Sequence, residues 1–536
     1  MSNENKDTAM LVHWADQTAE KIIRERGDLD QYTCASGITP SGTVHIGNFR
    51  EIISVDLVVR ALRDRGKKVR FIYSWDDYDV FRKVPENMPN KPILEQHLRF
   101  PITMVPDTTG RDTSYARHNE VDVESILPVV GIHPEFLYQA ERYRSNMYAE
   151  GMKIALQKRQ KIKDCLNYYR DEEHKIPAEE EYWPTAAFCC KCNKDTTEML
   201  DYDGEYGLTY KCTSCGHVEK ADLRTSKELK LGWRVDWPMR WNHEHTVFEP
   251  AGKDHHSKGG SFDTARLVSK EIYDWDAPVT FRYDFIGIKG LPGKMSSSKG
   301  QVISLYDVLN VYQPEICRYL FAGTRPNTEF SISFDLDVIK TYEDYDKTER
   351  IVFGVDKAKN DEVYAKERRI YELSQVDGNV PEMMPYQIPF RHLCNLLQTN
   401  SGDIDAIVAS LVDLKPEQEP RFRQRCKCAW YWITECAPED FKFALKNPLD
   451  GDYKTVAIES AELACLQKIY TDVLPKMDTL DEKQLSEAVY AVATDSGVEP
   501  KSLFTATYQA LIGKDQGPRL ANFMKIIGKK RLENIL

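Results

Sequence analysis

The sequence contains no long hydrophobic run. None of its apolar segments approaches the roughly 18 residues that a membrane-spanning helix requires, and the mean hydropathy is -0.53. The N-terminal segment MSNENKD is polar and lacks the apolar centre of a secretory signal peptide. We therefore expect no association with a membrane and a cytoplasmic location.

An excess of positive charge is also missing. The formal net charge is -12 and the isoelectric point is near 5.6. This balance argues against a protein whose whole surface covers nucleic acid, and we expect no DNA partner. It does not exclude local binding of RNA, since basic clusters occur at 158–163, 421–427 and 525–531. Each cluster by itself is typical of a solvated helix face.

A disulfide framework is not expected, because the chain has 13 cysteines, an odd number, and no secretory signal. Four cysteines instead form two Cys-x-x-Cys pairs with 19 residues between them. They are Cys189, Cys192, Cys212 and Cys215. This spacing predicts a zinc ribbon in which four thiolates close a tetrahedral shell, so the Zn²⁺ is structural. A redox function is the alternative, and Cys190 and His217 remain as spare residues of metal-binding type.

The stretch that tells most about function lies near the N-terminus. A strand-like run at 32–36 precedes the turn GITPSGTVHIGN at 37–48, and a helical pattern follows from about 49 to 65. A second strand pattern covers 68–73. Strand, glycine-rich turn, helix and strand form half of a nucleotide-binding α/β unit. The turn places His45 at a helix N-terminus, where N–H groups and the helix dipole favour phosphate.

A second glycine-rich loop, GLPGKMSSSKG, covers 290–300. Glycines at both ends and three serines between them indicate a mobile loop that closes on phosphate, although a flexible linker has a similar composition. The cation of Lys294 suits a pyrophosphate group, and Lys299 supplies a second positive charge.

The two motifs resemble the ATP-binding motifs of class I aminoacyl-tRNA synthetases, HIGH and KMSKS, in sequence, order and separation. Asn48 replaces the second His of the first motif, and Ser297 replaces the second Lys of the other motif. The resemblance implies that ATP is a substrate, that Mg²⁺ accompanies its phosphates, and that His45, Asn48 and Lys294 are catalytic. The ATP-binding residues that we expect are Pro40, Gly42, His45, Gly47, Asn48, Lys294, Met295, Ser296, Ser297 and Ser298.

Two further segments suit a ligand site. Acidic residues cluster at 74–79, after the second predicted strand, where they are equally consistent with binding of a cation and with a hydrogen-bonded loop. The segment 231–241 is rich in Trp and Arg and is either a structural cluster or the wall of a ligand site. Farther along, the pattern beyond about 381 is helical throughout.

The resemblance is closer still to class I lysyl-tRNA synthetases, and it covers essentially the whole chain. It rests on GITPSGTVHIGN, WRVDWP, AGKDH, KMSSSKG, the two Cys-x-x-Cys pairs and GPRL near residue 517. It implies lysine contacts at Gly37, Thr39, Trp233, His255 and Tyr283. Aromatic rings can flank the lysine chain and its cation, and Asp76, Asp236 or Asp254 can pair with the ammonium group; we include Asp254 among the expected substrate-binding residues.

The expected fold is α/β: a Rossmann-type parallel-sheet catalytic domain with a zinc-ribbon insertion, followed by an all-α C-terminal domain. The expected parts are 1–84 and 225–330 (the halves of the catalytic domain), 85–224 (an insertion with the ribbon at 184–220), 331–380 (a connecting region that contacts the tRNA stem) and 381–536 (a helical anticodon-binding domain).

The function that this resemblance implies is ATP-dependent ligation of L-lysine to tRNA(Lys) through a lysyl-adenylate. A class I synthetase for another amino acid, such as glutamate, is one alternative. A non-catalytic tRNA-binding paralogue is another, although His45, Lys294 and the glycines are intact. A small-molecule nucleotidyltransferase would not need the ribbon and the long helical C-terminal part.

Overall fold

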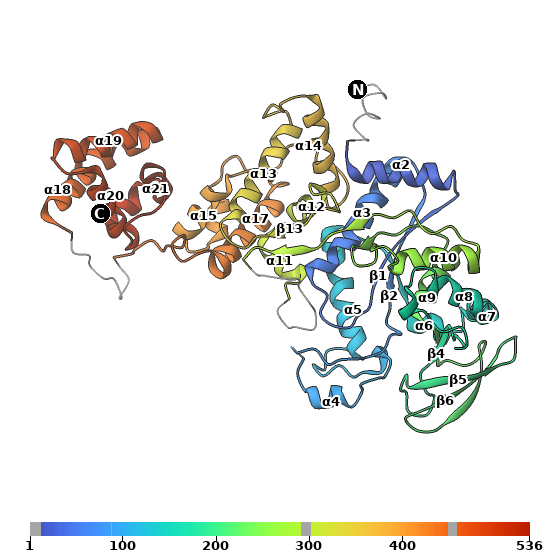
Figure 1. Cartoon of the computed structure of the whole chain (residues 1–536). Helices are drawn as coiled ribbons and strands as arrows, with labels where there is room; N and C mark the ends of the chain where they lie inside the picture. The colour runs from blue at the N-terminus through green and yellow to red at the C-terminus, as the bar shows by residue number, and fades with distance from the viewer. Residues whose placement is uncertain (1–11, 87, 291–301, 449–457) are drawn as a thin grey trace. The chain divides into compact units, whose positions relative to one another are not determined.

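A computed structural model of the chain describes residues 12–86, 88–290, 302–448 and 458–536 (Figure 1). The chain divides into two compact units. Unit 1 consists of 1–309, 314–332 and 348–380, and unit 2 consists of 310–313, 333–347 and 381–536. Among the described helices, none combines the length and the apolar character that crossing a membrane requires.

Unit 1 is built on a parallel sheet with the strand order β3-β2-β1-β9. These strands are β1 (Tyr32–Ile38), β2 (Val69–Trp75), β3 (Glu135–Tyr138) and β9 (Thr246–Phe248). Cys34 of β1 lies beside Phe71 of β2 on one side and Phe248 of β9 on the other. Most of β1 is buried, as is usual for a parallel strand covered on both faces. The predicted α/β fold with a parallel sheet is confirmed.

Helix α3 (Ile46–Asp64) is the crossover between β1 and β2. Its apolar residues are buried almost without interruption, and helix α2 (Trp14–Arg26) packs against it. The predicted start near residue 49 is wrong by three residues, because His45 is the N-cap and residues 46–48 already form the first helical turn. The HIGN motif is therefore part of the helix end and not of a preceding loop.

The segment between β2 and β9 contains short helices and two small sheets. Its helical elements are α4 (Lys91–Glu95), η1 (Ile102–Met104), α5 (Tyr115–Ile126), η2 (Leu127–Val130), α6 (Gln139–Arg144), α7 (Ala149–Gln157), α8 (Arg159–Asn167), η3 (Glu172–His174) and α9 (Trp233–His243). Its additional strands are β4 (Thr185–Ala187), β5 (Thr197–Tyr202), β6 (Gly207–Cys212), β7 (Val218–Asp222) and β8 (Leu229–Leu231). Residues 138–167 are mostly helical and are divided into α6, α7 and α8.

The first cysteine pair precedes the antiparallel sheet β5-β6-β7, and the second lies at the turn between β6 and β7. This sheet shares a hydrophobic core with its surroundings. Leu208 and Tyr210 of β6 pack in the same buried cluster as Met152 of α7 and Met239 of α9. The small sheet is thus held to the catalytic body by apolar contacts and not only by the chain that connects them.

After β9, unit 1 continues with short parallel ladders, β10 with β11 and β12 with β13. The elements of this part are β10 (Ala251–Gly252), α10 (Ser261–Tyr273), β11 (Arg282–Tyr283), β12 (Ile286–Ile288), α11 (Leu305–Val311), α12 (Pro314–Ala322), β13 (Phe330–Ile332), α13 (Asp337–Val352) and α14 (Asp361–Ser374). The strands β11 and β12 follow closely in sequence, but each pairs with a different strand. Residues of α11 and α13 are divided between the two units.

The described part of unit 2 is helical and contains no strand. Its elements are α15 (Phe390–Thr399), α16 (Ile404–Ser410), α17 (Glu419–Tyr431), η4 (Trp432–Cys436), α18 (Ser460–Lys468), η5 (Ile469–Val473), η6 (Leu474–Thr479), α19 (Glu482–Asp495), α20 (Pro500–Ile512), α21 (Leu520–Ile527) and α22 (Lys529–Ile535). Gly528, at a φ of 82°, separates α21 from α22, where one helix is predicted. The predicted all-α C-terminal region is confirmed for the described residues.

Candidate active site

A cavity of about 680 Å³ opens at the carboxyl ends of β1 and β2. Strand β1 has β2, its successor, on one side and the much later β9 on the other. In open α/β sheets ligands bind where the strand order reverses in this way. The size of the cavity is in the usual range for small-molecule sites.

Many of the residues predicted from the sequence meet in this cavity. Its lining includes His45, Gly47 and Asn48 from the expected ATP site, whereas Pro40 and Gly42 are not part of the lining. All of the expected substrate-binding residues line it: Gly37, Thr39, Trp233, Asp254, His255 and Tyr283. The remaining predicted residues lie outside the described part of the chain: Lys294, Met295, Ser296, Ser297 and Ser298.

The side chains of His45 and Asn48 close the N-terminus of α3 as a capping box. His45 Nδ1 accepts from the N–H of Gly47 at 3.1 Å, and Asn48 Oδ1 accepts from the N–H of His45 at 3.2 Å. The histidine proton is therefore on Nε2, and what Asn48 has left for a ligand is its NH₂ group. The N–H groups of Ile46 and Gly47 both have partners within the protein, since that of Ile46 donates to the carbonyl of Ile303 at 2.8 Å.

Both flanks of the KMSSSKG segment adjoin the cavity. Ile286 of β12, before the segment, is a lining residue. Ile303, after it, is bonded through its carbonyl to the first residue of α3. The described residues on either side of the second motif thus lie near the first motif, although the two are far apart in sequence.

Glu51 is the functional candidate that the sequence analysis missed. It lies one turn into α3 and lines the cavity. Its Oε1 accepts from the hydroxyl of Ser36 at 2.9 Å and from the N–H of Gly37 at 3.1 Å, and its Oε2 accepts from the hydroxyl of Tyr283. Burial raises the pKa of Glu51, although these donors oppose the shift. Among the described residues, no Lys, Arg or His forms an ion pair with this carboxylate.

Two other acids of the cavity have a cation of their own. Arg240 of α9 contacts Asp76 through Nη1 at 2.7 Å and Asp236 through Nη2 at 3.0 Å. The same Nη1 donates to the hydroxyl of Ser74 at 2.7 Å, and Tyr143 donates to Asp236. Of the alternatives for the acidic stretch 74–79, the hydrogen-bonded loop therefore describes Asp76, whereas Glu51 forms no ion pair with any described residue.

Trp residues spaced four apart on α9 pack against one another, and the first of them, Trp233, lines the cavity. Trp233 stacks on Trp237 with ring centroids 4.8 Å apart and an interplanar angle of 16°, and Trp237 lies 4.8 Å from Trp241. The inner indoles donate to Glu249 at 3.0 and 2.5 Å, which fixes their orientation. Trp233 itself is 42% exposed and belongs to the cavity lining, so its ring is available for a flat contact with a ligand.

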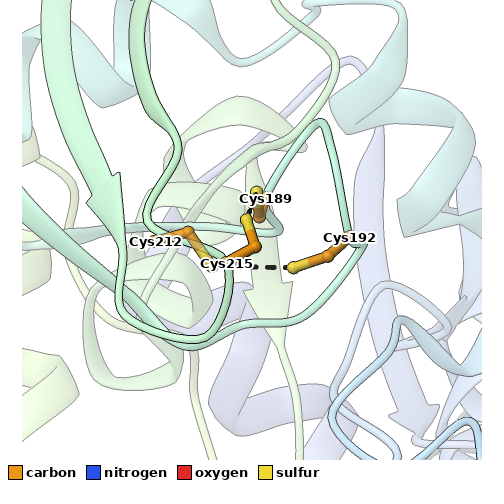
Figure 2. A group of neighbouring side chains, drawn as sticks. All are labelled: Cys189, Cys192, Cys212 and Cys215. Carbon is orange, nitrogen blue, oxygen red and sulfur yellow. Dashed lines mark hydrogen bonds between the residues drawn. The ribbon is translucent and has the colours of Figure 1, made fainter.

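The four predicted metal ligands converge at the end of the β5-β6-β7 sheet, as Figure 2 shows. Cys189 Sγ lies 3.6 Å from Cys215 Sγ, and Cys192 Sγ lies 3.6 Å from Cys212 Sγ. Tetrahedral Zn²⁺ with bonds of about 2.3 Å requires sulfur atoms roughly 3.8 Å apart, so the cysteines fit the ion. The first pair directly follows Phe188, which lines the cavity.

Unit 2 has a separate cavity of about 730 Å³. Its lining combines the cations Arg391, Lys514 and Arg519 with the ring of Phe441. The guanidinium of Arg391 lies 5.8 Å from the centre of that ring. Cations next to aromatic faces are the combination that binds single-stranded nucleic acid. Arg519 belongs to the GPRL motif, so this motif forms part of the cavity lining in unit 2.

Fold and site together define a nucleotide-binding α/β enzyme of the class I aminoacyl-tRNA synthetase type. A family model described as tRNA synthetases class I (K) matches residues 12–377, and one described as an anticodon binding domain matches residues 434–534. The chain belongs to the class I (K) family of tRNA synthetases.

Curated relatives match over almost their whole length. A lysine--tRNA ligase of Treponema pallidum is 60% identical, with 98% of each chain covered. Proteins of the same name from Borreliella burgdorferi and Thermococcus kodakarensis are 51% and 42% identical; the alignments cover 98% and 97% of this chain and 98% of each relative.

Proposed function

We propose that the chain ligates L-lysine to tRNA(Lys) in two steps, through a lysyl-adenylate, with release of AMP and diphosphate. Family membership supports the reaction class. The observation that carries the choice of amino acid is Glu51, an acid inside the cavity whose described partners are all neutral donors. A cationic side chain supplies the charge that this carboxylate lacks.

In the first step the carboxylate of lysine attacks the α-phosphate of ATP, which enters as its Mg²⁺ complex. The nucleophile is already ionised at neutral pH, so the protein has to orient the groups and stabilise the charge that develops on phosphate. We assign the donors His45 Nε2–H and the Asn48 amide to the phosphates, since both side chains face the cavity at the N-terminus of α3. Lys294 would contribute a cation from the second loop.

The lysine side chain would lie between Trp233 and Tyr283, with its ammonium group at Glu51. Tyr283 donates to Glu51 and so fixes the carboxylate, while the exposed face of Trp233 covers the methylene groups. A glutamate side chain would bring a second carboxylate toward Glu51, and this like-charge contact disfavours the glutamate-specific alternative.

The Zn²⁺ would be held by Cys189, Cys192, Cys212 and Cys215, and it supplies no chemistry because four thiolates leave no open position. Its contribution is to shape the wall that ends at Phe188. For the tRNA, we assign the cavity of unit 2 around Arg391 and Arg519 to an unpaired nucleotide of the anticodon loop. We retain 381–536 as the anticodon-binding domain, 331–380 as the connecting region, and a cytoplasmic location.

The test is charging of total tRNA with each of the twenty labelled amino acids. We compare the wild type with Glu51→Gln, with Lys294→Ala and with the control Glu25→Gln on the exposed side of α2. Charging with lysine alone, lost in the first two variants and kept in the control, supports the proposal. Charging with another amino acid overturns the assignment of Glu51, and no charging by folded, zinc-loaded wild type overturns the proposed activity.

A further inference from the structure

Next to the four-cysteine site lies a second group of metal-binding side chains that the catalytic function does not use. It consists of Cys190, His217 and Glu219, whose ligand atoms all lie within 4.8 Å of one another. Cys190 Sγ lies 3.3 Å from Glu219 Oε2, and His217 Nε2 lies 2.9 Å from the same oxygen. Cys190 is not a member of the four-sulfur group.

The backbone holds these side chains together. Glu219 is in β7, and His217 precedes it by two residues, so both side chains point to the same face of the strand. Tyr210 is opposite Glu219 in the register of β6 and β7. The hydroxyl of Tyr210 accepts from the N–H of Cys190 at 3.1 Å. Three segments of the ribbon thus bring these side chains together next to the closed site.

The donor set specifies the class of ion. One thiolate, one imidazole and one carboxylate suit Zn²⁺ and neighbouring transition metals, whereas Mg²⁺ and Ca²⁺ take oxygen ligands. With bonds of about 2.0 to 2.3 Å, donors on one Zn²⁺ lie roughly 3.2 to 3.7 Å apart, so the observed separations need only small adjustments. Three protein ligands leave a coordination position for water, and Cys190 is exposed.

We propose that Cys190, His217 and Glu219 form a second, exchangeable transition-metal site on the surface of the ribbon. It differs from the closed site in having mixed ligands and an open position. An ion bound there exchanges readily with solvent, whereas the ion of the four-cysteine site is retained.

The experiment counts metal in the full chain. After exposure to Zn²⁺ the wild type should hold two equivalents, of which a brief chelator treatment removes one. Co²⁺ added to that chelated sample should then produce a thiolate-to-cobalt charge-transfer band from one cysteine. In Cys190→Ser, His217→Ala and Glu219→Gln the affinity for this second ion should fall at least about tenfold, since losing even an outer partner of a ligand has such an effect. Charging activity and the retained equivalent should not change.

Cys436→Ser is the matched control, because Cys436 is a partly exposed cysteine outside the ribbon, and it should keep both equivalents. A wild type that binds one Zn²⁺ and shows no new band with Co²⁺ overturns the proposal and leaves a His217–Glu219 ion pair beside a hydrogen-bonded thiol. The proposal is also overturned if Cys190→Ser loses the Zn²⁺ that resists the chelator, since Cys190 would then be a ligand of the four-cysteine site. Glu219→Gln separates these results from misfolding because its shape is conserved.

Discussion

The carboxylates that line the cavity are held in two different ways. Asp76 and Asp236 share the guanidinium of Arg240, whereas Glu51 is held by Ser36, Gly37 and Tyr283, none of which carries a positive charge. A buried acid with an internal cation is part of the scaffold. We propose that a cavity acid with only neutral donors keeps its affinity for a cation from outside, and that this difference separates the substrate-binding acid, Glu51, from the scaffold acids.

The largest effect should come from removing the ion pairs of the scaffold acids Asp76 and Asp236. In Arg240→Met both Asp76 and Asp236 lose their counter-ion, and removing one partner of a buried ion pair lowers the free energy of unfolding by about 3–5 kcal/mol. Urea unfolding followed by tryptophan fluorescence measures this loss. Arg266→Met is the control, because Arg266 is 56% exposed and its distance to Asp263 is 3.5 Å, and it should change little. Unchanged stability in Arg240→Met would contradict the scaffold role.

Glu51→Gln should reduce catalysis with lysine by a free energy close to the stability loss of Arg240→Met. Its own stability should increase rather than decrease. Removing the partner of a buried ammonium costs about 2–5 kcal/mol, or roughly 30- to 5,000-fold in kcat/KM for lysine. The free energy of unfolding should rise at neutral pH, because the variant no longer buries an uncompensated charge. Charging kinetics and urea unfolding are measured on the same sample. A variant that is destabilised and retains lysine affinity would place Glu51 in the scaffold.

Tyr283→Phe should weaken lysine binding without abolishing it. The carboxylate keeps Ser36 and Gly37 but loses one donor, and a hydrogen bond to a charged group is worth about 1.5 kcal/mol at the low end, or roughly tenfold in KM for lysine. The KM for ATP should not change, which charging assays at varied ATP concentration can verify. A larger loss than that of Glu51→Gln would assign the main contact to Tyr283.

The smallest effect is a dependence on pH. Burial raises the pKa of Glu51 above its ordinary value of 4.5, so lysine affinity should fall as the pH drops through that raised pKa, by up to about tenfold per unit below it. The stability contribution has the opposite direction: it is present at low pH, where the carboxyl is neutral, and is lost as the pH rises through the folded pKa. Both trends should be absent in Glu51→Gln, and their persistence there would point to another group.

The sequence predicted the parallel sheet, the four-cysteine cluster and the helical character of unit 2, because each has a strong local pattern. It did not predict β3, which is only four residues long. It also did not single out Glu51, because α3 contains other buried charges. Arg50 is bonded to carbonyls at 325, 326 and 328, and Asp56 is paired with Arg318. Partners so distant in sequence cannot be assigned from the helix alone, so the sequence could not show that Glu51 forms no ion pair with a described residue.

The capping box of α3 restricts which residue types can occupy position 48. Position 48 has to accept a hydrogen bond from the backbone of His45 with one atom and present a donor to the cavity with another. Asn and His have such a pair of atoms on a short side chain, whereas Asp offers acceptors alone when ionised. Exchange between Asn and His should therefore preserve both of these contacts, whereas ionised Asp would preserve only the acceptor.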